Sequence, residues 1–216
     1  MKKVVGVAVG LAVAVALVVF YIVDWVLVSP PIATASSTGT QTANLVLQTV
    51  AAYGSAPNPD WVSYFEQDAQ GQWEHTTFFT LPAHSVINVT IYQYDGASGF
   101  RNPLWAQVRG TGDGTMGLNG KTMNAINFAD AAHSFTIPDL GVSVPLQGVP
   151  ATGSNPCPAG PCDTSFDHNT IKFSFTTGAP GEYRWQCFVP CAAGTFQGWG
   201  GPMQTLGYMD GEIYVR

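Results

Sequence analysis

Two cysteines, Cys187 and Cys191, stand four positions apart in the segment "GEYRWQCFVPCAAG" (181–194). An alternating aromatic run leads to the first cysteine, and a stretch of small residues follows the second. Two thiols in this position can close a disulfide, or their sulfurs can bind a metal. The spacing alone leaves both interpretations open.

The other two cysteines, Cys157 and Cys162, lie in "NPCPAGPC" (155–162) among prolines and glycine. A metal site would need histidine or carboxylate ligands nearby, and Asp163 alone is weak support for one. We therefore predict a local disulfide between these two cysteines.

A histidine adds a third candidate ligand to the first pair. His133, in "AAHSFTIPDLGVSVPL" (131–146), shares one face of a predicted strand with Phe135 and Ile137. A single histidine in a strand is compatible with a structural role. Thiolate, imidazole and thioether ligands together would select copper among the biological metals.

Alternating apolar residues predict the strands that must position these groups. The segments 85–94, 170–177 and 209–215 each place apolar side chains on one face. The turn sequence "GAPG" (178–181) predicts a hairpin between 170–177 and the strand that ends at Cys187. This hairpin would deliver Cys187 to the end of a core-facing row.

Composition supports an all-β protein with many turns. The chain has 24 glycines and 15 prolines, only 10% of its residues are charged, and its net charge is −6, which argues against a nucleic-acid partner. Two glycine- or proline-rich stretches, 95–130 and 147–169, are predicted to be long loops. Loops of this length usually cover or build a site.

The N-terminus has the pattern of a membrane anchor. Lys2 and Lys3 precede the uncharged stretch 4–23, which as a helix would be about 30 Å long. We predict a single-pass anchor over 1–29, a linker over 30–43 and one domain over 44–216 on the extracytoplasmic side of the cell membrane. A signal peptide cleaved after "ATA" (33–35) is the alternative. Either form of export permits disulfides.

Two motifs together resemble cytochrome c oxidase subunit II, a family of the cupredoxin superfamily. The first is a His-Ser-Phe triplet followed by a proline and a Leu-Gly pair; the second is a tyrosine four residues before a cysteine pair with four-residue spacing. The residues are His133, Ser134, Phe135, Pro138, Leu140, Gly141, Tyr183, Cys187 and Cys191. The resemblance covers roughly 80–95 and 131–216. It implies a cupredoxin-like Greek-key β-sandwich with one N-terminal transmembrane helix and a metal at one end.

The resemblance also implies a ligand set. In that family a binuclear CuA centre uses a first histidine, two cysteines, a backbone carbonyl between them, a second histidine and a methionine. Carried over to this chain, the ligands are His133, Cys187, the carbonyl of Val189, Cys191 and, in a Met-x-Gly closing strand, Met209. Met203 is a reserve candidate for the methionine.

The chain departs from the family pattern after Cys191. Thr195 and Gly198 stand where the family has histidine and methionine, and Gln204 or Leu206 falls on the second histidine when the loop is lengthened. The remaining histidines, at 75, 84 and 168, are weak substitutes. The resemblance therefore implies a single copper, an atypical CuA pair or no metal.

Two functions follow from this pattern. The first is a membrane-anchored, subunit II-like cupredoxin that binds copper for electron transfer in or to a respiratory membrane complex, whose other subunits would be its partners. The alternative is an accessory or scaffold subunit that has lost its metal and has a Cys187–Cys191 disulfide. No G-x-S-x-G segment indicates a hydrolase.

Overall fold

The computed structural model describes residues 2–23, 31–39, 41–53, 59–191 and 199–216. It divides into two compact units, 1–30 and 31–216. In the first unit, helix α1 (Lys2–Tyr21) contains most of the predicted anchor, and residues 24–29 of that prediction lie outside the described residues. None of the described helices combines the length and the hydropathy that a membrane span needs.

The second unit consists of two β-sheets, of six and eight strands in the described residues. The first sheet has the strand order β1 (Ile32–Thr34), β6 (Phe78–Leu81), β14 (Asp210–Val215), β13 (Gly181–Gln186), β10 (Ala131–Ile137) and β11 (Val142–Gln147). The second has the order β5 (Trp73–Glu74), β4 (Ser63–Gln67), β3 (Thr42–Val50), β7 (Val86–Gln93), β12 (Asn169–Thr176), β8 (Met116–Leu118) and β9 (Lys121–Met123), and β2 (Ser36–Gly39) pairs with β3.

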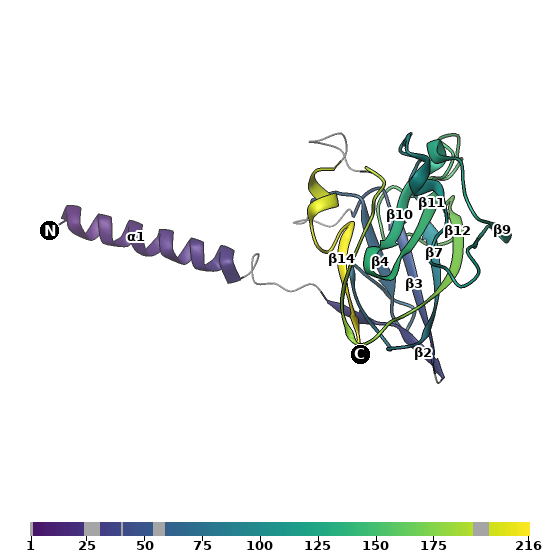
Figure 1. Ribbon diagram of the computed structural model, residues 1–216. Coiled ribbons are helices and arrows are strands. Elements are labelled where there is room, and N and C mark those ends of the chain that lie inside the picture. The colour runs from purple at the N-terminus through teal and green to yellow at the C-terminus, as the bar shows by residue number, and fades with distance from the viewer. Residues whose placement is uncertain (1, 24–30, 40, 54–58, 192–198) are drawn as a thin grey trace. The chain divides into compact units, whose positions relative to one another are not determined.

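Strand pairing is mixed. β1 and β14 each run parallel to β6, and β3 runs parallel to β7, whereas the other ladders are antiparallel. Figure 1 shows β10 beside β11 and β7 beside β12. Four short 3₁₀ helices lie in the described connections: η2 (Pro103–Ala106), η3 (Phe128–Asp130), η4 (Pro138–Leu140) and η5 (Gly201–Gln204).

The two sheets bury their apolar faces against each other, which makes the unit a β-sandwich. The predicted alternation in β7 and β12 is confirmed, because Val89 pairs with Phe173 and both side chains are buried. Across the interface, the Phe135 ring of β10 lies 5.7 Å from the Phe173 ring of β12, centroid to centroid. Leu45 of β3 and Trp185 of β13 are also fully buried in this core.

The segment 30–43, predicted as a polar linker, contains strands. Residues 32–34 form β1, residues 36–39 form β2, and β3 already begins at Thr42. β1 adds a parallel strand to β6, and the small side chains of Ala33 and of Ala35, the residue after β1, are buried. A stretch of small and polar residues resembles a linker in sequence, but it can also lie flat along a sheet edge. The compact unit therefore begins at Pro31 rather than at residue 44.

The predicted hairpin before Cys187 is also wrong. β12 pairs with β7 and β8 in one sheet, whereas β13 pairs with β14 and β10 in the other. The "GAPG" turn therefore carries the chain from one sheet to the other. A short turn between two alternating segments is compatible with a hairpin and with a crossing between sheets. The strand partners of the two segments show that this turn is a crossing.

The stretch 95–130 is more regular than the predicted loop. It contains η2, η3 and the hairpin β8–β9, whose turn residues Asn119 and Gly120 both have positive φ angles, 49° and 81°. This is the residue pair that a two-residue hairpin turn favours. Residues 148–168 form no strand, as predicted.

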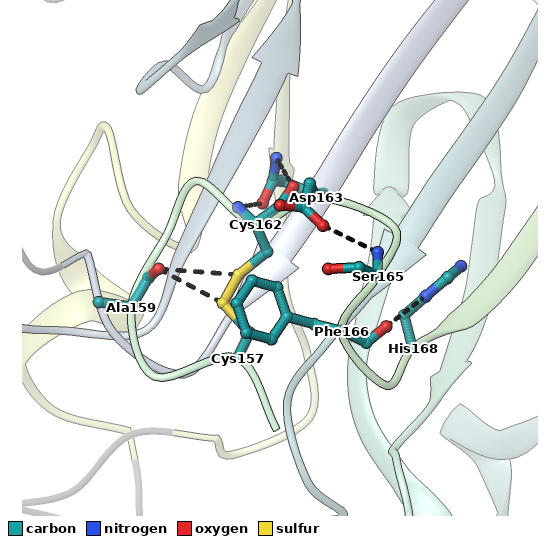
Figure 2. Close-up of a disulfide and its surroundings, with 8 residues drawn as sticks. Cys157, Ala159, Cys162, Asp163, Ser165, Phe166 and His168 are labelled. Atoms are coloured by element: carbon teal, nitrogen blue, oxygen red, sulfur yellow. Dashed lines mark hydrogen bonds between the residues drawn. A yellow bond between two sulfur atoms is a disulfide. The ribbon is translucent and has the colours of Figure 1, made fainter. Parts of the chain in front are cut away.

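The predicted disulfide is confirmed in the second long loop. Cys157 and Cys162 are bonded, with their Cα atoms 6.2 Å apart. Figure 2 shows the bond with Ala159, whose carbonyl oxygen lies 3.3 Å from Cys157 Sγ. Both cysteines belong to a small buried cluster with Phe65 and Tyr94, separate from the main core. The disulfide therefore fixes a loop that has its own apolar contacts.

Candidate metal centre

The sandwich brings three predicted ligands together. His133 lies in β10, Cys187 follows directly after β13, and Cys191 lies four residues further along. One ring nitrogen of His133 and the two sulfurs all lie within 4.8 Å of one another. In the described part of the chain, His133, Cys187 and Cys191 form the group of histidine, cysteine and acidic side chains whose ligand atoms lie close enough together to hold a metal ion.

The two cysteines are free thiols rather than a disulfide. Their sulfurs are 3.6 Å apart, and Cys191 Sγ lies 3.2 Å from the thioether sulfur of Met203 in η5. The backbone carbonyl of Val189 lies 3.3 Å from Cys187 Sγ. The two thiols near His133 are thus each in contact with one further donor, a carbonyl at Cys187 and a thioether at Cys191.

Backbone hydrogen bonds hold the cysteine loop against β10. The Ser134 N–H donates to Cys187 Sγ at 3.3 Å, and the Ser134 hydroxyl accepts the Phe188 N–H at 2.9 Å. On the other side, the Cys187 N–H donates to the Met209 carbonyl at 2.9 Å. Because β10 and β13 share only a short ladder, at Thr136 and Gln186, these bonds extend the contact as far as the thiols.

His133 is fully buried and faces an acidic side chain. Its Nε2 lies 3.1 Å from Asp95 Oδ2, which is an ion-pair distance, although the contact lacks the alignment of a hydrogen bond. Its Nδ1 is buried and has no hydrogen-bond partner. A buried nitrogen without a partner costs free energy unless something else occupies its lone pair or takes its proton. A metal ion next to the two sulfurs would meet that need.

The local charges favour a thiolate at Cys187. Burial raises the pKa of the Cys187 thiol, but Cys191 and His133 outweigh that effect and hold this pKa well below its usual range. Burial lowers the pKa of His133, whereas Asp95 and Cys187 raise it, to about 9. Burial and the neighbouring Cys187 thiolate raise the pKa of the Cys191 thiol. One thiolate is therefore stabilised beside an imidazolium, and a metal ion would take the place of that positive charge.

Aromatic side chains enclose the centre. Trp185, two residues before Cys187, is fully buried, with its ring 4.9 Å from that of Tyr64. The Tyr64 hydroxyl donates to the carbonyl of Ser134 at 3.1 Å. On the outer side, the Phe188 ring stacks on Trp105 of η2, with centroids 4.7 Å apart. These rings pack around both ligand-bearing segments, and Cys187 is fully buried, whereas Cys191 is half-buried.

The donor set fits copper better than the other common metals. Two soft sulfurs, a thioether and an imidazole are ligands that copper prefers, whereas Mg²⁺ and Ca²⁺ take oxygen ligands. In this structure Nδ1 of His133 has no hydrogen-bond partner, and the sulfurs of Cys187, Cys191 and Met203 lie close together. The residues present therefore fit a copper site.

The two candidate methionines differ in position. Met203 places its sulfur beside Cys191, whereas Met209 is fully buried and contacts the centre through its backbone carbonyl. The Met209 N–H in turn donates to the carbonyl of Pro202. The sulfur of the reserve candidate, Met203, therefore lies beside the thiol pair. The metal role of either methionine stays a prediction.

The other histidines are engaged elsewhere. The His75 ring stacks on Tyr53 with centroids 3.9 Å apart, and His168 Nδ1 lies 2.8 Å from the carbonyl of Phe166. His84 lies in a turn, where its N–H donates to the carbonyl of Gly178. None of the three belongs to the group formed by His133 and the two free thiols in the described residues. Thr195 and Gly198 lie outside those residues.

Sequence reasoning missed Asp95. It follows β7 by two residues, and the only sequence signal is an acidic residue before a glycine at the end of a predicted strand. Its closeness to His133, thirty-eight positions later in the chain, depends on how β7 and β10 are placed in different sheets.

No family model and no curated protein sequence matches this chain. Among solved structures, rusticyanin from Thiobacillus ferrooxidans is 17% identical, with 85% of this chain and 87% of that chain covered and a TM-score of 0.33. A reduced rusticyanin is 18% identical, with 88% and 87% covered and a TM-score of 0.33. A chain of a heme-copper terminal oxidase dimer is 14% identical over 100% of both chains, with a TM-score of 0.36. Similarity at this level carries no argument about function, which therefore rests on the centre itself.

Proposed function

We propose that the chain is a cupredoxin-like electron-transfer protein that binds copper at His133, Cys187, Cys191 and Met203. The observation that carries this proposal is the convergence of an imidazole nitrogen and two free thiols within 4.8 Å, at the end of a rigid β-sandwich. The Met203 sulfur and the Val189 carbonyl extend the same donor set. When bound, copper supplies a centre that gains and loses one electron.

The protein's own part is to hold the ligands still. The Ser134 amide and hydroxyl fix Cys187 and Phe188 against β10, and the Met209 carbonyl fixes the Cys187 amide from the other side. Ligands that cannot move keep nearly the same arrangement in both oxidation states, so little energy is needed to reorganise the site on electron transfer. Cys187, like the rings of Trp185 and Tyr64, is fully buried, which keeps water away from its sulfur.

We further infer that residues 1–29 anchor the protein in the cell membrane, with the sandwich on the extracytoplasmic side as part of a respiratory complex. The basic start and uncharged stretch of the sequence support this proposal, as does a disulfide, which persists in oxidising compartments. N-terminal sequencing of membrane-extracted protein tests it. A mature chain that starts at Ser36 would show that the segment is a cleaved signal peptide.

A second candidate function is a metal-free accessory subunit. The observation that favours it is that the described residues bring one histidine to the centre, whereas a family-type binuclear site needs two. In that case the two sulfurs, 3.6 Å apart, would form a disulfide after a small movement.

Copper titration of the full-length chain separates the two functions. If copper binds, the purified protein should develop an intense sulfur-to-copper charge-transfer band, and His133→Ala should abolish it. Because His133 is fully buried, circular dichroism has to confirm that this variant remains folded. A colourless wild type in which thiol labelling finds no free cysteine would contradict copper binding and favour the accessory subunit.

A further inference from the structure

We propose that Asp95 is a positioning residue of this centre: its carboxylate holds the proton of His133 at Nε2, so that Nδ1 is the nitrogen offered to the metal. This inference rests on the proposed copper site. It starts from an ion pair between a buried and a half-buried side chain, because His133 is 0% exposed and Asp95 is 22% exposed, with Oδ2 3.1 Å from Nε2.

Asp95 is held in place independently of His133. Its Oδ1 accepts the N–H of Gly96 at 2.7 Å, which leaves Oδ2 for the imidazole. Its backbone carbonyl accepts two donors, the N–H of Val149 at 2.9 Å and the side-chain amide of Gln93 at 3.1 Å. Gln93 is itself fully buried. The carboxylate is thus fixed before any ligand binds.

The segment after Asp95 is fastened to the strand that carries His133. Both the N–H and the hydroxyl of Ser98 donate to the carbonyl of Ala131, at 3.0 and 2.8 Å. Gly148 allows the close approach on the other side, since a Cβ there would lie 2.4 Å from the Ala97 nitrogen. These contacts fix the separation of Asp95 and His133 through the backbone rather than through two mobile side chains.

The chemistry of imidazole explains what this pair can do. A neutral imidazole has one N–H and one lone pair, and a partner that accepts the N–H decides which nitrogen is free to bind a metal. Here Nε2 lies 3.1 Å from Asp95 Oδ2, at ion-pair distance but without the alignment of a hydrogen bond, and Nδ1 is also buried without a hydrogen-bond partner. Carboxylate partners of metal-binding histidines also fix the ring orientation, and their loss typically weakens metal affinity about 10- to 100-fold.

The charge balance agrees with this assignment. A centre with two cysteine sulfurs already carries negative charge, so a carboxylate in direct contact with the metal would add repulsion. Placed behind the imidazole, Asp95 keeps the ring polarised towards the metal without becoming a ligand. An ion pair that serves folding alone would stabilise the metal-free protein but would have no effect on which ring nitrogen binds the metal.

The test compares full-length wild type, Asp95→Ala and the matched control Asp130→Ala. Asp130 is an exposed carboxylate three residues before His133, and its removal causes the same loss of charge. Copper affinity is measured by competition with a chelator of known affinity. We expect Asp95→Ala to bind copper about 10- to 100-fold more weakly and Asp130→Ala to stay within about twofold of wild type. Equal affinity in Asp95→Ala and wild type would overturn the proposal.

A second measurement does not need copper. Nitrogen-15 NMR of the histidines in copper-free protein, at a pH where the His133 ring is neutral, shows which nitrogen carries the proton. We expect the Nε2–H form in wild type and a mixture in Asp95→Ala; the Nδ1–H form in wild type would overturn the proposal. If wild type binds no copper, the proposed function fails, and this measurement still decides the role of Asp95. If Asp95→Ala does not fold, Asp95→Asn takes its place, with the same direction expected.

Discussion

The two cysteine pairs have nearly equal spacing and opposite fates. Cys157 and Cys162 close a disulfide in a loop that packs on Phe65 and Tyr94. Cys187 and Cys191 remain free thiols beside His133 and Met203. The sulfurs of the first pair lie near the Ala159 carbonyl and an apolar cluster, whereas those of the second pair face an imidazole and a thioether. The surroundings of a thiol pair, more than its spacing, therefore decide between a disulfide and two free thiols.

The largest effect is expected when Cys187, in the free pair, is replaced. Cys187→Ala removes the thiol that accepts the Ser134 N–H and lies next to both Cys191 and His133. We expect a complete loss of the charge-transfer band and of bound copper in the purified full-length chain, measured by absorbance and metal analysis. The control is the double variant Cys157→Ala/Cys162→Ala, which should retain both. A double variant that loses copper would show that the two pairs are not independent.

The same double variant should lose stability. Removal of the bond opens a small loop, for which chain entropy predicts a loss of about 2 kcal/mol in the free energy of unfolding, measured in urea. Cys191→Ala serves as the comparison, because this half-buried thiol forms no disulfide and its loss should lower the free energy of unfolding less. An equal loss in both variants would mean that packing, rather than the cross-link, accounts for the effect.

Met203→Leu and Met209→Leu test which methionine sulfur acts together with the free pair. Leucine keeps the apolar volume of methionine but has no sulfur. Because Met203 sulfur lies 3.2 Å from Cys191 Sγ, its replacement should shift the charge-transfer band and weaken copper binding about tenfold, or about 1.4 kcal/mol. Met209→Leu should change neither property. The reverse result would move the thioether ligand to Met209.

The last comparison is between a buried charge that is paired, that of His133, and a buried carboxyl group that is not, that of Glu66. Whereas His133 faces Asp95, Glu66 in β4 is 2% exposed, lies opposite Glu74 and has an Oε2 without a hydrogen-bond partner. Burial, followed by Glu74 and Asp68, raises the pKa of Glu66 to about 7. A carboxyl group whose pKa is raised on folding destabilises the native state progressively as the pH rises from about 4.5 to about 7.

Glu66→Gln should therefore be more stable than wild type at pH 8, by roughly 1 to 2 kcal/mol. The advantage should disappear near pH 4, where the glutamic acid is protonated in both the native and the unfolded state. Urea unfolding at the two pH values measures this difference, and Glu74→Gln, at a more exposed position of the same strand pair, should give a smaller gain in the same direction because it removes one cause of the raised pKa of Glu66. A constant advantage at both pH values would point to packing rather than charge.

The local sequence was sufficient for much of the fold. Alternation in 85–94 and 170–177 predicted β7 and β12, because an apolar residue at every second position has to face a core. The proline- and glycine-rich context of Cys157 and Cys162 predicted their bond. The local sequence was not sufficient to predict the edge strands β1 and β2, since their small and polar residues show no such alternation. Nor could it show that the turn at 178–181 connects two sheets.

For the centre, the spacing of Cys187 and Cys191 and the motif around His133 were sufficient to name three of the residues that converge. The sequence could not show that Met203 lies beside Cys191 or that Asp95 faces the imidazole. Asp95 is fixed near the site by backbone hydrogen bonds between segments far apart in the chain, and the side-chain amide of Gln186 donates to the Met203 carbonyl. The approach of β7 to β10 across the sandwich is a property of the packed core, and no local pattern of residues records it.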